Sequence, residues 1–315
     1  MILEKRDPRA EFGAAVTEIA AQDDRVVVLS ADSGGSSGFG KFAEQYPERY
    51  FECGIMEQTT VGMAAGMATA GKIPVFCAIA PFVTARPFEM VRNDVGYMHQ
   101  NVKIVGRNGG MTYSDLGATH HSLEDFAIMR MIPGMTVLAP QDVSEIISAV
   151  KAMLEYEGPV YMRIGSEKQQ DIIQDRKFII GQGYVIKEGT DLTVITTGTV
   201  TRNTLEAADK LEKTGISVEV LGMPTVWPLD ERLVLSSVKK TKRVVTVEEH
   251  YVYGGLGGAV AELCAEKLCV PVKRIGVPHV YVTTGPYPEL LKKYGLDKEG
   301  IYRSICDFMK TSKRG

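Results

Sequence analysis

The stretch ECGIMEQTTVGMAAGMATAGKIPVF, residues 52–76, places a helix of small residues directly before a buried strand. Glu57 falls at the expected start of this helix, where a carboxylate complements the helix dipole by a few tenths of a kcal/mol. From Gly62 to Ala68 the helix is unusually rich in Ala and Gly for one on a protein surface, so we expect it to pack very closely against another backbone. A glutamate that leads such a helix would be partly desolvated and able to share a proton with a nitrogen atom of a ligand.

Apolar runs and helical patterns alternate on both sides of this stretch. Near-continuous runs of β-branched residues, separated by amphipathic helices, are typical of parallel sheets that are covered on both faces. The predicted strands include VVVLSAD ending at Asp32, IPVFCAI at 73–79, VKIVG, TVLAP, DLTVITTG, ISVEVLG and RVVTVEE. The predicted helices include residues 9–22, one from about Glu57, one reaching about His99, one through Thr214 and one from about Leu256.

The alternation lapses after residue 164, where the sequence is polar and irregular and contains the charged stretch EKQQDIIQDRK. We therefore predict an α/β protein with two doubly wound domains and mainly parallel sheets. The first domain covers residues 1–166, a linker covers 167–189, and the second domain covers 190–315.

The overall composition is typical of a soluble globular protein. The 315 residues suffice for two domains, and the net charge of −3 gives no reason to expect a nucleic acid or a membrane surface as partner. No apolar run approaches the roughly 18 residues that a membrane span needs, and the N-terminus does not resemble a secretory signal. The cysteines form no CxxC pair, so we interpret them as buried small hydrophobic residues in a reducing, cytoplasmic compartment. They are Cys53, Cys77, Cys264, Cys269 and Cys306.

In doubly wound sheets, ligand-binding groups gather in the loops beyond the carboxyl ends of the strands. Four such loops stand out, namely Ser33–Phe39, Ala80–Phe88, Arg107–His121 and Glu248–Gly258. The first and third are rich in Gly, Ser, Thr and His, as binding loops often are. The glycines of Ser33–Phe39 would serve equally well as turn residues, so both interpretations of that loop stay open.

Several motifs together resemble the transketolases. They are GIMEQ at 54–58, APFVTARPFEMVR at 80–92, LGATHHSLEDFA at 116–127, PGMTVLAPQD at 133–142 and VEEHYVYGGLG at 247–257. The similarity covers nearly the whole chain. It implies a thiamine-diphosphate pyrimidine-binding fold followed by a transketolase C-terminal domain.

The resemblance implies a set of residues that bind the cofactor. Glu57 matches the glutamate that hydrogen-bonds N1′ of the aminopyrimidine ring of thiamine diphosphate and promotes the imino form, whose nitrogen removes the thiazolium proton. Phe82 matches the aromatic residue that packs on this ring, with Arg86 and Phe88 as close supports. Asp32 matches a carboxylate at the subunit interface near the cofactor.

The resemblance also implies residues that bind the sugar. His120 matches a histidine that contacts the sugar hydroxyls, and Arg9 and Ser36 match residues that hold the phosphate of the acceptor. Taken alone, Arg9 would be a solvated N-terminal charge. Ser166 and Asn108 stand where the family has a phosphate-binding arginine and histidine. Two phosphate ligands are therefore missing, so either the sugar is not an ordinary pentose 5-phosphate or other residues hold it.

The motif GDG, with which the family binds the diphosphate and its metal, does not occur in the sequence. We therefore expect a separate N-terminal transketolase subunit to hold most of the thiamine diphosphate and the Mg²⁺, in an assembly of two plus two chains. With it, the chain would transfer a two-carbon ketol unit from a ketose (phosphate) donor to an aldose acceptor, and without it the chain would be inactive. The alternatives are the beta subunit of a 2-oxo-acid dehydrogenase, a fragment of a 1-deoxyxylulose-5-phosphate synthase, or a regulatory homologue without catalysis.

Overall fold

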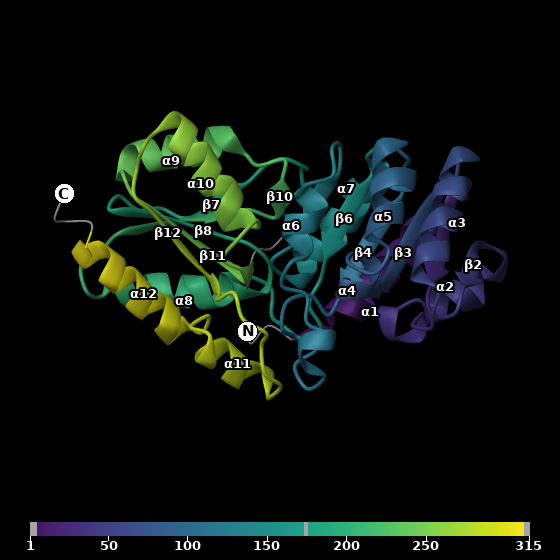
Figure 1. Ribbon diagram of the computed structural model, residues 1–315, viewed down its shortest axis with the longest axis horizontal. Helices are drawn as coiled ribbons and strands as arrows, with labels where there is room; N and C mark the ends of the chain where they lie inside the picture. The colour runs from purple at the N-terminus through teal and green to yellow at the C-terminus, as the bar shows by residue number, and fades with distance from the viewer. Residues whose placement is uncertain (1–4, 173–175, 312–315) are drawn as a thin grey trace.

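The computed structural model describes residues 5–172 and 176–311, which form two α/β units side by side (Figure 1). The outermost residues of both predicted domains, and residues 173–175 of the predicted linker, lie outside the described residues. Each unit is built around a mainly parallel sheet with helices on both faces (Figure 1), so the predicted fold class is confirmed.

The first sheet has seven strands, which are β1 (Val26–Ser30), β2 (Tyr50–Glu52), β3 (Ile73–Ile79), β4 (Lys103–Arg107), β5 (Thr136–Leu138), β6 (Val160–Arg163) and β10 (Thr225–Trp227). Their order across the sheet is β10-β5-β6-β4-β3-β1-β2. All neighbours are parallel except β10 and β5. The carboxyl ends of β1, β3 and β4 therefore open on the same edge, where the predicted binding loops lie.

The second sheet has five strands, which are β7 (Tyr184–Lys187), β8 (Leu192–Thr196), β9 (Val218–Gly222), β11 (Val244–Tyr251) and β12 (Val272–Val277). Their order is β12-β11-β8-β9-β7, and only β7 is antiparallel to its neighbour. Strand β7 falls within the segment 167–189 that was predicted as a linker, and it extends the second sheet.

The α-helices cover both sheets. They are α1 (Pro8–Ala20), α2 (Gly40–Gln45), α3 (Glu57–Thr69), α4 (Ala80–Val83), α5 (Phe88–Met90), α6 (Asp125–Arg130), α7 (Val143–Glu155), α8 (Thr201–Glu212), α9 (Glu231–Thr241), α10 (Leu256–Lys267), α11 (Tyr287–Lys293) and α12 (Lys298–Thr311). Short 3₁₀ turns occupy Gly35–Ser37, Pro47–Arg49, Gly117–Thr119 and Gly198–Val200, and a π-helical segment occupies Val91–Tyr97.

The prediction of one helix from the end of β3 to about His99 was wrong, because the helix is interrupted after Val83 and resumes only at Phe88. Helix α4 ends at Val83, α5 starts only at Phe88, and a π-helical segment follows α5 without a break. The cause is Pro87, which lacks a backbone N–H and disfavours helical backbone at the residue before it. Phe82 in α4 and Arg86 in the interruption both line a cavity at the carboxyl edge of the sheet.

The face of α3 that carries Gly66 has no other part of the described chain packed against it. Ala64 and Ala65 are buried against the sheet, but a Cβ atom added at Gly66 would meet no atom of the described residues within 4 Å. Ile55 and Met56, which directly precede the helix, are 70% and 53% exposed. Within the described residues, the small residues on this face therefore have no backbone packed against them.

Several contacts join the units, among them one strand pairing and a group of hydrogen bonds to a single carboxylate. Strand β10 belongs to the C-terminal half of the sequence but pairs with β5 of the first sheet. The buried Glu249, on β11 of the second sheet, accepts hydrogen bonds from the backbone N–H of Met111 at 2.6 Å and from the hydroxyls of Thr199 and Tyr287 at 2.5 and 2.8 Å. The loop after β4 is thus fixed by a carboxylate from the other unit.

The cysteines are only partly as predicted. Cys77 and Cys264 are buried, Cys53 and Cys306 are half-buried, and Cys269 is exposed in the turn after α10. Among the described helices, none is both long and apolar enough to cross a membrane.

Candidate active site

A cavity of about 460 Å³ opens at the carboxyl ends of β1, β3 and β4, next to the start of α3. Six of the residues predicted for the site line it, namely Asp32, Ser36, Glu57, Phe82, Arg86 and His120. They come from four separate stretches of sequence that the parallel sheet brings to one edge.

Glu57 is the first residue of α3 and is 2% exposed, so the predicted desolvation of this carboxylate is confirmed. Its Oε1 accepts a hydrogen bond from Nη1 of Arg86 at 2.5 Å. A buried carboxylate is costly unless a partner compensates its charge. Arg86 supplies this compensation, and it also fixes the direction in which the carboxylate points.

Aromatic contacts extend this pair across the cavity. The guanidinium carbon of Arg86 lies 3.9 Å from the centroid of the Phe82 ring, which is within the range of a cation–π contact. The Phe82 ring meets His120 edge-on at 5.2 Å, and His120 meets Tyr113 at 5.5 Å. Nδ1 of His120 lies 2.9 Å from the hydroxyl of Thr119. A continuous series of contacts therefore runs from Glu57 to Tyr113.

The loop Ser33–Phe39 is held against α1 by two glycines. A Cβ atom on Gly13 would lie 2.0 Å from the carbonyl oxygen of Gly38, and one on Gly38 would lie 2.2 Å from the carbonyl oxygen of Arg9. Gly38 also has a φ of +85°, which favours glycine. Gly38 of this loop thus serves its close packing on α1, through contacts with Arg9 and Gly13.

A second cavity, of about 690 Å³, contains the other predicted sugar-binding residues, Arg9, Asn108 and Ser166. Arg9 forms an ion pair with Asp7 at 3.0 Å, and hydrogen bonds to that carboxylate raise the pKa of Arg9. The hydroxyl of Ser166 donates to the carbonyl oxygen of Thr112 at 3.3 Å. Tyr113 lines both cavities, so the two spaces adjoin.

Two of the predicted cofactor-binding residues lie at the margin. Asp32 is exposed in the left-handed region with a φ of +54°, and its backbone N–H donates to Glu52 at 2.6 Å. Phe88 packs half-buried against the hydrophobic core of the first unit.

Comparison with known families agrees with this geometry. Residues 4–169 match the family model described as "Transketolase, pyrimidine binding domain", and residues 181–301 match "Transketolase, C-terminal domain". The chain belongs to the transketolase family. Membership in this family implies dependence on thiamine diphosphate.

Several relatives have nearly the same length as this chain. It is 40% identical over 304 residues to a subunit of the apulose-4-phosphate transketolase of Phocaeicola vulgatus, covering 96% of this chain and 97% of that one. It is 39% identical over 303 residues to the 6-deoxy-6-sulfo-D-fructose transketolase subunit SqwH of a Clostridium species, covering 96% and 94%. A solved structure described as a split gene transketolase, inactive beta4 tetramer, is 38% identical with a TM-score of 0.90, covering 98% of this chain and 100% of that one.

The residues of the first cavity fit the pyrimidine half of the transketolase cofactor. A buried carboxylate, Glu57, stands beside an aromatic ring, Phe82, in a space of about 460 Å³. This combination offers one proton-exchanging group and one flat apolar surface, as a heteroaromatic ring with a basic nitrogen requires.

Sequence reasoning placed Arg107 and Tyr113 in a candidate binding loop but gave neither of them a role, and both line the first cavity. Arg107 is the last residue of β4 and is 3% exposed. The sequence feature that could have identified Arg107 is its position as a charged residue at the end of an otherwise apolar strand, VKIVGR, on the edge of the sheet where ligands bind.

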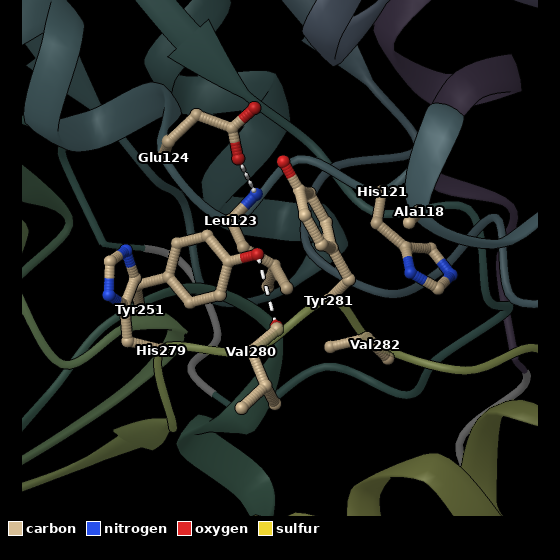
Figure 2. A pocket seen from close by; sticks show the side chains of 9 residues that line it. All are labelled: Ala118, His121, Leu123, Glu124, Tyr251, His279, Val280, Tyr281 and Val282. Atoms are coloured by element: carbon tan, nitrogen blue, oxygen red, sulfur yellow. Dashed lines mark hydrogen bonds between the residues drawn. The ribbon is translucent and has the colours of Figure 1, made fainter.

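A third cavity, of about 410 Å³, lies between the loop around His121 and the segment after β12. Figure 2 shows His121 and Tyr281 among the side chains that line it, with the hydroxyl of Tyr251 donating to the carbonyl oxygen of Val280 at 3.2 Å. His121 is buried, and its ring nitrogens have no hydrogen-bond partner in the described part of the chain. Burial lowers the pKa of His121. His120 and His121 thus line different cavities.

Proposed function

We propose that this chain is the pyrimidine-binding subunit of a thiamine-diphosphate-dependent transketolase, which transfers a two-carbon ketol unit from a ketose (phosphate) donor to an aldose acceptor. The observation that carries this proposal is the buried Glu57 at the start of α3, facing a cavity that also contains Phe82 and His120. The relatives named as transketolase subunits support it. Both substrates in those names, apulose 4-phosphate and 6-deoxy-6-sulfo-D-fructose, carry an anionic group.

Thiamine diphosphate, when bound, supplies a carbon nucleophile that the protein's own side chains lack. Glu57 would hold the basic ring nitrogen of the pyrimidine and carry the proton at that nitrogen. Phe82 would pack against the ring, and Arg86 keeps the Glu57 carboxylate in place. With Nδ1 of His120 beside the Thr119 hydroxyl, Nε2 of His120 is left for a sugar hydroxyl.

We further propose that a partner chain with the diphosphate- and metal-binding domain completes the site, holds Mg²⁺ and forms a two-plus-two assembly. The exposed face of α3 supports this, because Gly66 allows close approach and Ile55 and Met56 offer apolar surface beside Glu57. Tyr97 ends the π-helical segment that packs against α3, and its large side chain is 87% exposed. The names of the relatives, which denote one subunit of a transketolase and a split-gene transketolase, are consistent with a two-chain enzyme.

The test is reconstitution of the purified chain with its partner subunit, thiamine diphosphate and Mg²⁺. Ketose donors and 2-oxo acids are then compared as substrates. Transfer of a two-carbon unit to an aldose supports the proposal. Decarboxylation of 2-oxo acids without ketol transfer would instead favour the dehydrogenase subunit, and cofactor binding without turnover of either would favour a regulatory homologue.

A further inference from the structure

Arg107 projects from the carboxyl end of β4 into the wall of the 460 Å³ cavity. Its guanidinium donates from Nε to Ser37 Oγ at 3.1 Å, from Nη1 to Asn108 Oδ1 at 2.8 Å and from Nη2 to Ser36 Oγ at 2.8 Å. Ser36 and Asn108 are residues that sequence similarity assigned to the sugar. In this structure, the side-chain oxygens of these two residues accept hydrogen bonds from Arg107.

The charge of Arg107 has no neutralising partner in the part of the chain that the structure describes. All three of its hydrogen-bond acceptors are neutral oxygens, and no carboxylate of the described residues forms an ion pair with it. Burial lowers the pKa of Arg107, and the charge of Arg9 acts in the same direction. Arg163, which is also buried, instead pairs with Asp125 at 3.0 Å.

A buried cation without a counter-ion costs several kcal/mol, so its retention at a cavity wall indicates that a ligand supplies the negative charge. A guanidinium has five N–H donors. Three are used by the neutral oxygens, which leaves two for Tyr113, water or a ligand. Such a planar cation matches the oxygen atoms of a phosphate or sulfonate.

The adjoining 690 Å³ cavity is a poorer place for an anion. Its one arginine, Arg9, is already paired with Asp7. The carboxylates of Asp115 and Glu167 line the same space, and Glu167 stands next to Ser166. An anionic group would be repelled from that end and attracted to Arg107.

We propose that Arg107 binds the anionic group of the sugar substrate, a phosphate or a sulfonate, and takes the place of the phosphate ligands that are missing at Asn108 and Ser166. This inference rests on the proposed function and names its substrate class. It reverses the expectation, from Asn108 and Ser166 alone, that a phosphate is recognised weakly. Tyr113 contacts His120 and also neighbours Arg107, so a sugar with its hydroxyls at His120 would place its far end near the guanidinium.

The experiment compares the assembled wild-type enzyme with its Arg107→Gln and Arg107→Lys variants. The acceptors are ribose 5-phosphate and unphosphorylated ribose. To test a sulfonate, 6-deoxy-6-sulfofructose is used as the ketose donor. For the phosphorylated acceptor, kcat/KM of Arg107→Gln should fall by about 10- to 150-fold, mainly through KM, since one charge-assisted contact is removed. For ribose, kcat/KM of Arg107→Gln should change little. For the phosphorylated acceptor, kcat/KM of Arg107→Lys should lie between the values of wild type and Arg107→Gln. Arg25→Gln, an exposed arginine at the opposite end of β1, is the matched control.

A second measurement does not depend on turnover. Calorimetric titration of the complex with inorganic phosphate should show binding to wild type and to Arg25→Gln, and loss of binding in Arg107→Gln. If Arg107→Gln fails to assemble, competition by inorganic phosphate against the phosphorylated acceptor in wild type decides. Equal losses with both acceptors, or a wild type that neither binds phosphate nor prefers the phosphorylated sugar, overturn the proposal. A complex that binds phosphate through Arg107 but transfers no ketol unit would instead overturn the proposed function.

Discussion

Replacing Glu57 with glutamine tests the site with the smallest change in shape. The amide oxygen still accepts from Arg86, whose Nη1 lies 2.5 Å from Glu57 Oε1, and the volume of the buried side chain is kept. The variant loses the ability to take up and release a proton. A positioned proton transfer contributes about 10²–10⁴ in rate, so kcat should fall by that factor, or about 2.7–5.5 kcal/mol in the barrier.

The assay is steady-state ketol transfer by the assembled enzyme at saturating thiamine diphosphate, with cofactor affinity measured separately by calorimetry. Affinity should weaken only modestly, because the new amide would still offer one hydrogen bond and Phe82 is unchanged. Glu44→Gln, an exposed carboxylate on α2, serves as the matched control and should keep normal turnover. Near-normal turnover of the Glu57→Gln complex would refute the role given to this residue.

Three further predictions follow from single features of the chain. The isolated subunit should bind thiamine diphosphate weakly or not at all, and micromolar binding in calorimetry would contradict the need for a partner. Arg86→Met should lower kcat/KM by about 10- to 150-fold, because the charge-assisted bond to Glu57 is removed, while a result like that of wild type would show that the ion pair is dispensable. Burial raises the pKa of Glu145 from 4.5 to about 7, so the stabilisation that its protonated form provides is complete below about pH 4.5 and is lost as the pH rises through about 7. In denaturant unfolding, the free energy of unfolding of wild type should therefore fall by about 3 kcal/mol relative to that of Glu145→Gln as the pH is raised from about 4.5 to about 8. Glu155→Gln, at an exposed position on the same helix, should follow wild type.

The parts of the fold that the sequence predicted are those set by local pattern. The run IPVFCAI forms β3 with the predicted bounds, and α3 and α10 begin at Glu57 and Leu256 as expected. Continuous β-branched runs indicate strands buried on both faces, and the small residues of α3 fit a helix. These signals depend on neighbouring residues alone, so they can be read without knowledge of the tertiary structure.

The parts that the sequence did not predict depend on distant contacts. The short strand TVW, β10, becomes recognisable only through its pairing with β5 of the other unit, and β7 only through its pairing with β9. The break between α4 and α5 could have been predicted from Pro87, but the prediction gave more weight to the helical pattern of the surrounding residues. Glu249, which fixes the loop at Met111, has no motif that links it to a residue 138 positions earlier.

Arg86 and Arg107 show why the site needed the structure. Both are arginines in the wall of one cavity, and nothing in the sequence distinguishes their charges. Arg86 is neutralised by Glu57, whereas the described partners of Arg107 are neutral oxygens. One end of the cavity is therefore electrically balanced and suits a neutral heteroaromatic ring, while the other end keeps a positive charge. In the proposed reaction, this charge distribution would orient a sugar with its reactive end toward Glu57 and its anionic end toward Arg107, since the ring contacts of His120 and Tyr113 connect the two ends.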